Sequence, residues 1–163
     1  MNKPLKRLLR KNKGKAMLSS YEVLFIESGF KKQDLNHVNL DASDEIIQKV
    51  RALIPKFKYD SEQISGKAES FLASTLLKAV YDKYKNSDCY IYTDAHEYCG
   101  MYNVSTESTF EFAFNVALKD SQHTCFLIDK EFNYTFTLNY YDNSHNDSPD
   151  TFDIQRRMII DKQ

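Results

Sequence analysis

The chain has 163 residues and a formal net charge of −1, with 42% hydrophobic and 28% charged residues. These values are typical of a globular protein that buries an ordinary core, and they exclude a disordered chain. Only four glycines and three prolines disfavour a turn-rich sandwich or barrel, and the length predicts a single domain over residues 1–163.

The charges are strongly sorted along the chain. Before Glu22 there are seven cations and no anion, whereas from residue 16 onward there are 15 basic and 23 acidic residues. The near-neutral total therefore hides a dipolar molecule, and this bears on what the surface attracts rather than on the fold. The seven cations are Lys3, Lys6, Arg7, Arg10, Lys11, Lys13 and Lys15.

The basic start does not lead into a signal peptide, because Leu5, Leu8 and Leu9 are followed at once by polar residues. No stretch approaches the roughly 18 apolar residues of a membrane span. The three cysteines show no framework spacing, which favours a reducing compartment. We therefore expect a cytoplasmic protein that does not enter the membrane.

The first half of the chain is predicted to be helical. Leucines at helical spacing favour a short helix over 4–12 that ends at Gly14, and a second helix is expected over 19–29. A third is expected over 43–54, before a proline. The strongest prediction is one long helix over 60–85, which opens on a pair resembling a capping box. Its apolar positions are Ile64, Phe71, Leu72, Leu76, Val80 and Tyr84.

The second half of the chain is predicted to contain strands. Apolar runs at 89–92 and 97–104 favour two of them, and 126–128 with 134–138 favour two more. The polar residues at 129–131 predict a tight turn, so a C-terminal β-hairpin is expected over 123–140. The fold class is therefore α+β, with N-terminal helices packed on a small, mostly antiparallel sheet.

Residues 105–119 fit two patterns. The alternation of Phe110, Phe112 and Phe114 is typical of a strand, whereas other residues of the segment share one helical face. Ser105 and Thr106 are good helix caps, so we prefer a helix. An all-strand meander from 88 to 141 is the alternative.

No metal or cofactor is expected. Asp94, His96 and Cys99 have ligand-like spacing, but the second ligand pair of a structural zinc site is missing. The oxygen-rich segment 142–153 resembles an EF-hand loop, yet it has Asp147 where the sharp turn requires glycine. Buried apolar cysteines and a solvated acidic loop explain both patterns.

The sequence also argues against an enzyme. Cys99 could pair with His96 or His123 as a nucleophile and base, but no glycine-rich turn or elbow surrounds it. Four scattered glycines cannot cradle a phosphate. The acidic turn residues are ordinary turn carboxylates, and we assign no catalytic role to them.

The basic segment 3–15 suggests a different function, which is salt-sensitive binding to nucleic acid. The acidic remainder of the chain would repel a polyanion, so direct binding is disfavoured. A nucleic-acid-associated regulatory or accessory protein that uses this basic helix is therefore the alternative function. The competing explanation is a solvated helix whose leucines complete the core.

Residues 106–141 resemble the ending of small bacterial immunity proteins of contact-dependent inhibition and related polymorphic toxin systems. A Phe-rich segment leads into Cys-Phe-Leu-Ile-Asp-Lys-Glu-Phe-Asn-Tyr-Thr-Phe-Thr-Leu at 125–138. In that class a final hairpin with an acidic turn is often followed by an aromatic residue. Here Asp129, Phe132 and Tyr134 occupy those positions.

The resemblance implies a non-enzymatic cytoplasmic inhibitor that binds and neutralises a cognate protein toxin, and we expect this toxin to be a basic nuclease. Between residues 131 and 155 the chain has five anions and no lysine or arginine, and an acidic surface rich in tyrosine suits a basic cleft. The first predicted contact residues are Tyr140, Tyr141, Asp142, Asp147, Asp150 and Asp153. The second group is Asp94, Glu97, Asp129 and Glu131.

Overall fold

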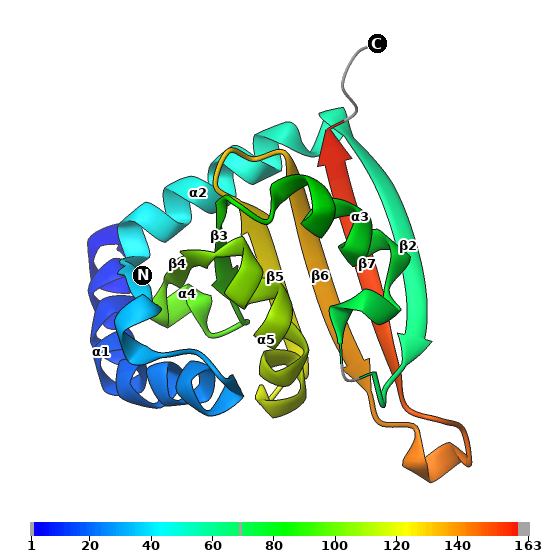
Figure 1. Cartoon of the computed structure of the whole chain (residues 1–163). Helices are drawn as coiled ribbons and strands as arrows, with labels where there is room; N and C mark the ends of the chain where they lie inside the picture. The colour runs from blue at the N-terminus through cyan, green and yellow to red at the C-terminus, as the bar shows by residue number, and fades with distance from the viewer. Residues whose placement is uncertain (1, 69, 160–163) are drawn as a thin grey trace.

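The computed structural model describes residues 2–68 and 70–159, which form helices packed on an antiparallel sheet (Figure 1). The α+β class, with helices towards the N-terminus and strands towards the C-terminus, is confirmed. The α-helices are α1 Lys3–Ser28, α2 Leu40–Leu53, α3 Thr75–Tyr84, α4 His96–Cys99 and α5 Thr106–Lys119. The 3-10 turns are η1 Lys32–Asp34, η2 Ile54–Lys56, η3 Phe71–Ala73 and η4 Ser144–Asn146.

The described strands form one seven-stranded sheet in the order β1-β4-β3-β5-β6-β7-β2, and all its neighbouring pairs are antiparallel. The short β1 and the long β2 are therefore its two edges. The strands are β1 Asn36–Val38, β2 Phe57–Ser65, β3 Asp88–Tyr92, β4 Met101–Ser105, β5 Thr124–Asp129, β6 Tyr134–Tyr141 and β7 Thr151–Ile159.

The predicted C-terminal hairpin is confirmed as β5 and β6, with Leu127 opposite Phe136. Its turn is closed by Asp129, whose Oδ2 accepts hydrogen bonds from the backbone N–H of Asn133 at 3.0 Å and from its side-chain amide at 2.6 Å. Phe132 adopts a φ of 63° in this turn. The carboxylate of Asp129 therefore fixes the turn from inside.

The two faces of the sheet are covered unequally. One face carries the main core, which α1, α3 and α5 cover; its largest side chains include Phe25, Phe110, Tyr134, Phe136 and Phe152. On the other face α2 covers only a smaller cluster formed by Ile46, Tyr92, Met101 and Ile128. Apart from the buried Thr135, the side chains on the same face of β6, β7 and β2 stay partly or fully exposed, so this part of the face is open to solvent.

The single helix expected over 60–85 is wrong. Residues Phe57–Ser65 form β2, which pairs with β7 along its whole length. Helix α3 begins only at Thr75, after η3. The apolar residues had helical spacing because a strand, a 3-10 turn and a helix pack in sequence on the same core.

Glu62 on β2 explains why α3 starts where it does. Its carboxylate accepts hydrogen bonds from the backbone N–H groups of Thr75 at 3.0 Å and Leu76 at 3.2 Å. The Ser74 side chain accepts a further bond from the N–H of Leu77 at 3.1 Å. These acceptors satisfy amides that a helix start leaves without partners.

Three other predictions are revised or confirmed. The expected strand over 97–104 is divided into α4 and β4 at Gly100, whose φ of 78° favours glycine. Residues 105–119 form the preferred helix, α5, and the Ser105 side chain caps it by accepting from the N–H of Ser108 at 3.2 Å. The helix expected over 43–54 is α2, but its cap is Asn39. The strands β1 and β7 were not predicted.

The expected helices at 4–12 and 19–29 are one continuous helix, α1, which runs along one side of the molecule (Figure 1). Gly14 does not end it. A Cβ at this buried position would collide with the backbone carbonyl of Tyr98, so the glycine lets α1 approach α4 closely. Leu5, Leu8 and Leu9 do not complete the core, since they are 49%, 55% and 50% exposed.

We expect Gly14→Ala to lower the free energy of unfolding by about 1–3 kcal/mol, because the added methyl group overpacks the contact between α1 and α4. The substitution would otherwise stabilise a helix by about 1 kcal/mol. Urea unfolding followed by circular dichroism measures the change. Asn12→Ala, on the exposed side of the same helix, is the control and should not lose stability. Equal or greater stability of Gly14→Ala would contradict the packing argument.

Candidate functional site

The loop between β6 and β7 gathers the first group of predicted contact residues. It spans residues 142–150, contains η4, and extends beyond one end of the sheet (Figure 1). The paired strands β6 and β7 hold the two ends of the loop side by side, because β6 ends at Tyr141 and β7 begins at Thr151. The residues brought together are Tyr140, Tyr141, Asp142, Asp147, Asp150 and Asp153.

Asp150 organises this loop from within. Its Oδ1 accepts a hydrogen bond from the N–H of Asn143 at 2.9 Å, and its Oδ2 accepts one from the Tyr140 hydroxyl at 2.8 Å. Its backbone carbonyl accepts from the N–H of Gly66 at 2.7 Å. The bond to this carboxylate raises the pKa of Tyr140. Asp150 and Tyr140 thus hold the loop in shape, and both remain partly exposed beside it.

The other four residues of the group are presented to solvent. Tyr141 is 49% exposed, Asp142 and Asp147 are exposed, and Asp153 is partly exposed on β7. Hydrogen bonds from the side chain and the backbone N–H of Ser144 lower the pKa of Asp142, so this group stays ionised. We call Tyr141, Asp142, Asp147 and Asp153 the loop surface.

The second predicted group does not join the loop surface. Asp94 follows β3 at the same end of the sheet, two strands away from β6. Glu97 is exposed on α4, and both residues border a hollow of about 720 Å³ together with His96 and Arg51. This hollow has charges of both signs, unlike the loop surface.

Asp129 and Glu131 lie at the opposite end of the sheet, in the β5–β6 turn. Glu131 is exposed there, but Asp129 is only 1% exposed. The prediction that Asp129 contacts a partner is therefore wrong, because its carboxylate lies inside the turn that it stabilises.

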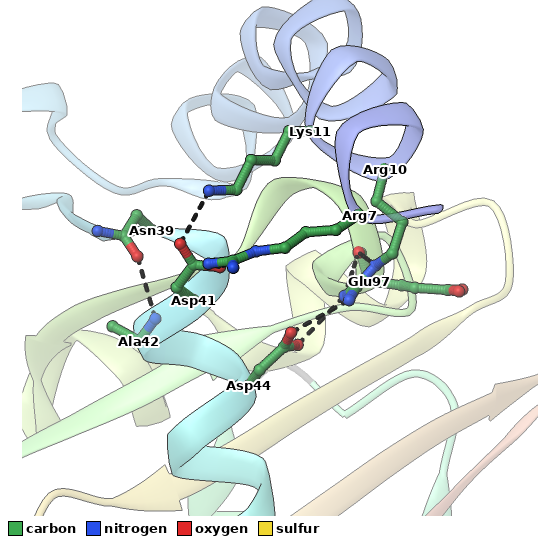
Figure 2. Close-up of polar contacts among 8 residues, drawn as sticks. All are labelled: Arg7, Arg10, Lys11, Asn39, Asp41, Ala42, Asp44 and Glu97. Carbon is green, nitrogen blue, oxygen red and sulfur yellow. Dashed lines mark hydrogen bonds and ion pairs between the residues drawn. The ribbon is translucent and has the colours of Figure 1, made fainter. Parts of the chain in front are cut away.

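The basic N-terminal segment makes ion pairs within the protein (Figure 2). The Arg10 guanidinium donates two hydrogen bonds to the carboxylate of Asp44, both at 3.1 Å. It also donates to the backbone carbonyl of Glu97 at 2.8 and 3.0 Å. The hydrogen bond to Asp44 raises the pKa of Arg10. One side chain thus joins α1 to α2 and to α4.

A second carboxylate on α2 has two cationic partners. Asp41 lies 2.7 Å from a guanidinium nitrogen of Arg7 and 2.9 Å from the ammonium of Lys11 (Figure 2). Lys13 lies over the ring of Tyr98, 3.9 Å from its centroid. Four of the seven cations are therefore engaged within the protein. This weakens the alternative function of nucleic-acid binding, which needs the same charges.

Sequence reasoning missed the residues of the open sheet face next to the loop. Gln63 on β2 lines a shallow hollow with Tyr141, Thr151 and Asp153. Of these residues, Gln63 and Thr151 were not among the predicted contacts, because residues 60–65 of β2 were expected to be helical and β7 was not predicted. The β-favouring Phe57 and Tyr59, separated by the polar Lys58, were the available signal in the sequence.

The cysteines do not belong to this site. Cys89, Cys99 and Cys125 are buried free thiols. Burial raises all three pKa values, that of Cys89 to about 12, so none resembles an activated nucleophile. Within residues 2–68 and 70–159, no three His, Cys, Asp or Glu side chains form a group that could hold a metal ion.

Comparisons with known proteins leave the site to be interpreted from its own chemistry. No family model, curated protein or solved structure matches the chain. Among the described helices, none has the length and apolar character that crossing a membrane requires.

Asp41 predicts an acid-dependent weakening of the contact between α1 and α2. Hydrogen bonds from Lys11 and Arg7 lower its pKa below the ordinary value of about 3.9. A carboxyl group with a lowered folded pKa contributes stability that is fully present above its unfolded pKa. That contribution is lost as the pH falls through the folded pKa.

We therefore expect the free energy of unfolding of wild type to exceed that of Asp41→Asn at neutral pH, and the difference to shrink below about pH 4. Urea unfolding at a series of pH values measures this difference. Asp82→Asn, at an exposed position on α3, is the control and should follow wild type throughout. Parallel curves for wild type and Asp41→Asn would rule out the predicted coupling.

Proposed function

We propose that the protein is an immunity-type inhibitor that binds a cognate protein toxin through the loop surface. The observation that carries the proposal is the presentation of Asp142, Asp147, Asp153 and Tyr141 on a loop that Asp150 holds in shape. This agrees with the resemblance of residues 106–141 to immunity proteins. The partner is expected to be basic, as a toxin that acts on nucleic acid would be.

The construction of the loop supports a binding role in physical terms. Hydrogen bonds from Asn143 and Tyr140 to Asp150, and from Gly66 to its carbonyl, order the loop before any partner arrives. A preordered surface loses less conformational entropy on binding than a free chain does. Clustered carboxylates accelerate the encounter with a cationic protein, and an exposed tyrosine provides an apolar anchor with a polar tip.

The distribution of the cations supports a protein partner rather than a nucleic acid. Arg7, Arg10 and Lys11 already neutralise Asp41 and Asp44. A polyanion would have to displace these carboxylates before it could bind the same side chains. A basic protein meets no such competition at the loop surface.

The function is tested by searching the neighbouring genes for a toxin domain and producing that domain in cells, with and without the protein. We expect the protein to restore growth and to form a complex with the purified toxin domain. A triple variant, Asp142→Asn, Asp147→Asn and Asp153→Asn, should associate about 10-fold more slowly at low salt because steering is lost. Its rate should also depend less on salt concentration.

The matched control removes three exposed charges elsewhere: Asp82→Asn, Glu111→Gln and Glu131→Gln. It should associate at the rate of wild type. Tyr141→Ala should weaken binding by about 2 kcal/mol, mainly through faster dissociation. Growth that the protein does not restore would overturn the immunity function. Equal rates for the triple variant and wild type would instead move the interface away from the loop surface.

A further inference from the structure

One exposed side of α1 carries large apolar side chains towards both ends of the helix. Of the large hydrophobic side chains that are exposed in the described chain, five belong to α1: Leu5, Leu8, Leu9, Val23 and Ile26. They are between 37% and 55% exposed. The opposite side of the helix carries its buried residues, among them Gly14, Tyr21 and Phe25. The apolar side therefore faces away from the body of the protein.

The exposed side follows the spacing of a helix-pairing surface. Residues 5, 9, 12, 16, 19, 23 and 26 are separated alternately by four and three positions, which is the heptad pattern of paired helices. We call these residues the seam: Leu5, Leu9, Asn12, Ala16, Ser19, Val23 and Ile26. Small residues at the middle allow a second helix to approach closely, and the apolar residues lie towards both ends.

The charges beside the seam are sorted in a way that specifies the partner. Lys6, Lys13 and Lys15 lie in the first half of α1, and Glu22 and Glu27 lie in the second half. This order is the reverse of the one that the helix dipole favours. In the first half, Arg7, Arg10 and Lys11 form ion pairs with α2, whereas in the second half Glu22 pairs with the exposed Lys32 at 3.1 Å.

We propose that α1 pairs with the α1 helix of a second copy of this chain, antiparallel, along the seam. In this arrangement the leucines of one copy pack on Val23 and Ile26 of the other at both ends. The basic half of each helix then meets the acidic half of its partner. A parallel pair would place Lys6, Lys13 and Lys15 beside the same cations. The surface is self-complementary, as a two-fold interface requires.

This inference does not depend on the proposed function, because α1 and the loop surface are different parts of the molecule. The two surfaces share no residue, so a dimer leaves both copies of the loop surface free to bind. The helix has 26 residues and is about 39 Å long at about 1.5 Å per residue, and the seam from Leu5 to Ile26 takes up about 32 Å of that length.

Sedimentation equilibrium and light scattering on the purified full chain test the pairing. We expect wild type to have twice the mass of one chain at micromolar concentrations. The seam variant, Leu5→Gln, Leu9→Gln and Val23→Gln, should be monomeric with an unchanged circular dichroism spectrum. The control, Ile54→Gln, Leu72→Gln and Leu118→Gln, replaces residues that are 47%, 57% and 37% exposed outside α1 and should remain dimeric.

Disulfide cross-linking tests the direction of pairing in an otherwise intact chain, since the native thiols are buried. Positions 5 and 26 are about 32 Å apart along one helix. Leu5→Cys should therefore not cross-link to itself, but a mixture of Leu5→Cys and Ile26→Cys should form a mixed dimer on oxidation. Self-linked Leu5→Cys would overturn the antiparallel arrangement.

Three other results would overturn the proposal. One is a monomeric wild type at all accessible concentrations. Another is a seam variant that remains dimeric. The third is a monomer whose seam binds vesicles of phosphatidylglycerol and phosphatidylcholine instead, with binding lost in the seam variant; the exposed leucines would then serve a membrane surface.

Discussion

The position of α1 depends on one guanidinium group. Arg10 joins α1 to Asp44 on α2 and to the main chain of α4, and these two helices contact the sheet at different places. One helical turn later, Gly14 removes the side chain that would hold α1 away from α4. The guanidinium links the first half of α1 to both helices, and the glycine allows the close approach to α4. Because both fix the same side of the helix, the opposite side is left for solvent or for another protein.

The charge sorting of the sequence acquires a different meaning in the folded chain. As a linear pattern, a basic start and an acidic remainder suggest a dipolar molecule. In the fold, Asp41 and Asp44 come from the segment that packs on the basic half of α1, and they pair there with three of its seven cations. The acidic excess is then left at the β6–β7 loop. The distribution of charge along a sequence therefore predicts the charge of a surface only when the ion pairs of the fold are also known.

The sequence predicted the elements whose signals are local. Ser105 gave the start of α5, and the polar turn at 129–131 gave the β5–β6 hairpin. It failed for β2, because the partner of this strand lies far away: Ser61 pairs with Gln155. No periodicity within either segment reveals such a pairing, and the apolar residues that follow β2 imitate a helix.

The candidate site was also predicted only in part, because its hydrogen bonds depend on the folded backbone. Composition alone selected the acidic segment 142–153 with Tyr140 and Tyr141, and the fold brings these residues together around the β6–β7 loop. Composition could not distinguish Asp142, which is exposed, from Asp150 and Asp129, which accept hydrogen bonds inside their turns. Whether a carboxylate is exposed or hydrogen-bonded depends on which N–H groups lie close to it, and this is determined by the conformation of the backbone in each turn.

The pairing of β2 with β7 has a consequence for how the chain is made. A ribosome that adds about 5–20 residues per second needs roughly 5–20 s to pass from Ser61 to its partner Gln155. During that interval β2 lacks its neighbour in the sheet and is open to pairing with another nascent chain. The nearby bonds from Ser74 and Thr75 to Glu62 can already tether the strand to α3. The charged side chains of Lys58 and Asp60 disfavour edge pairing with strands of other chains until β7 has been synthesised.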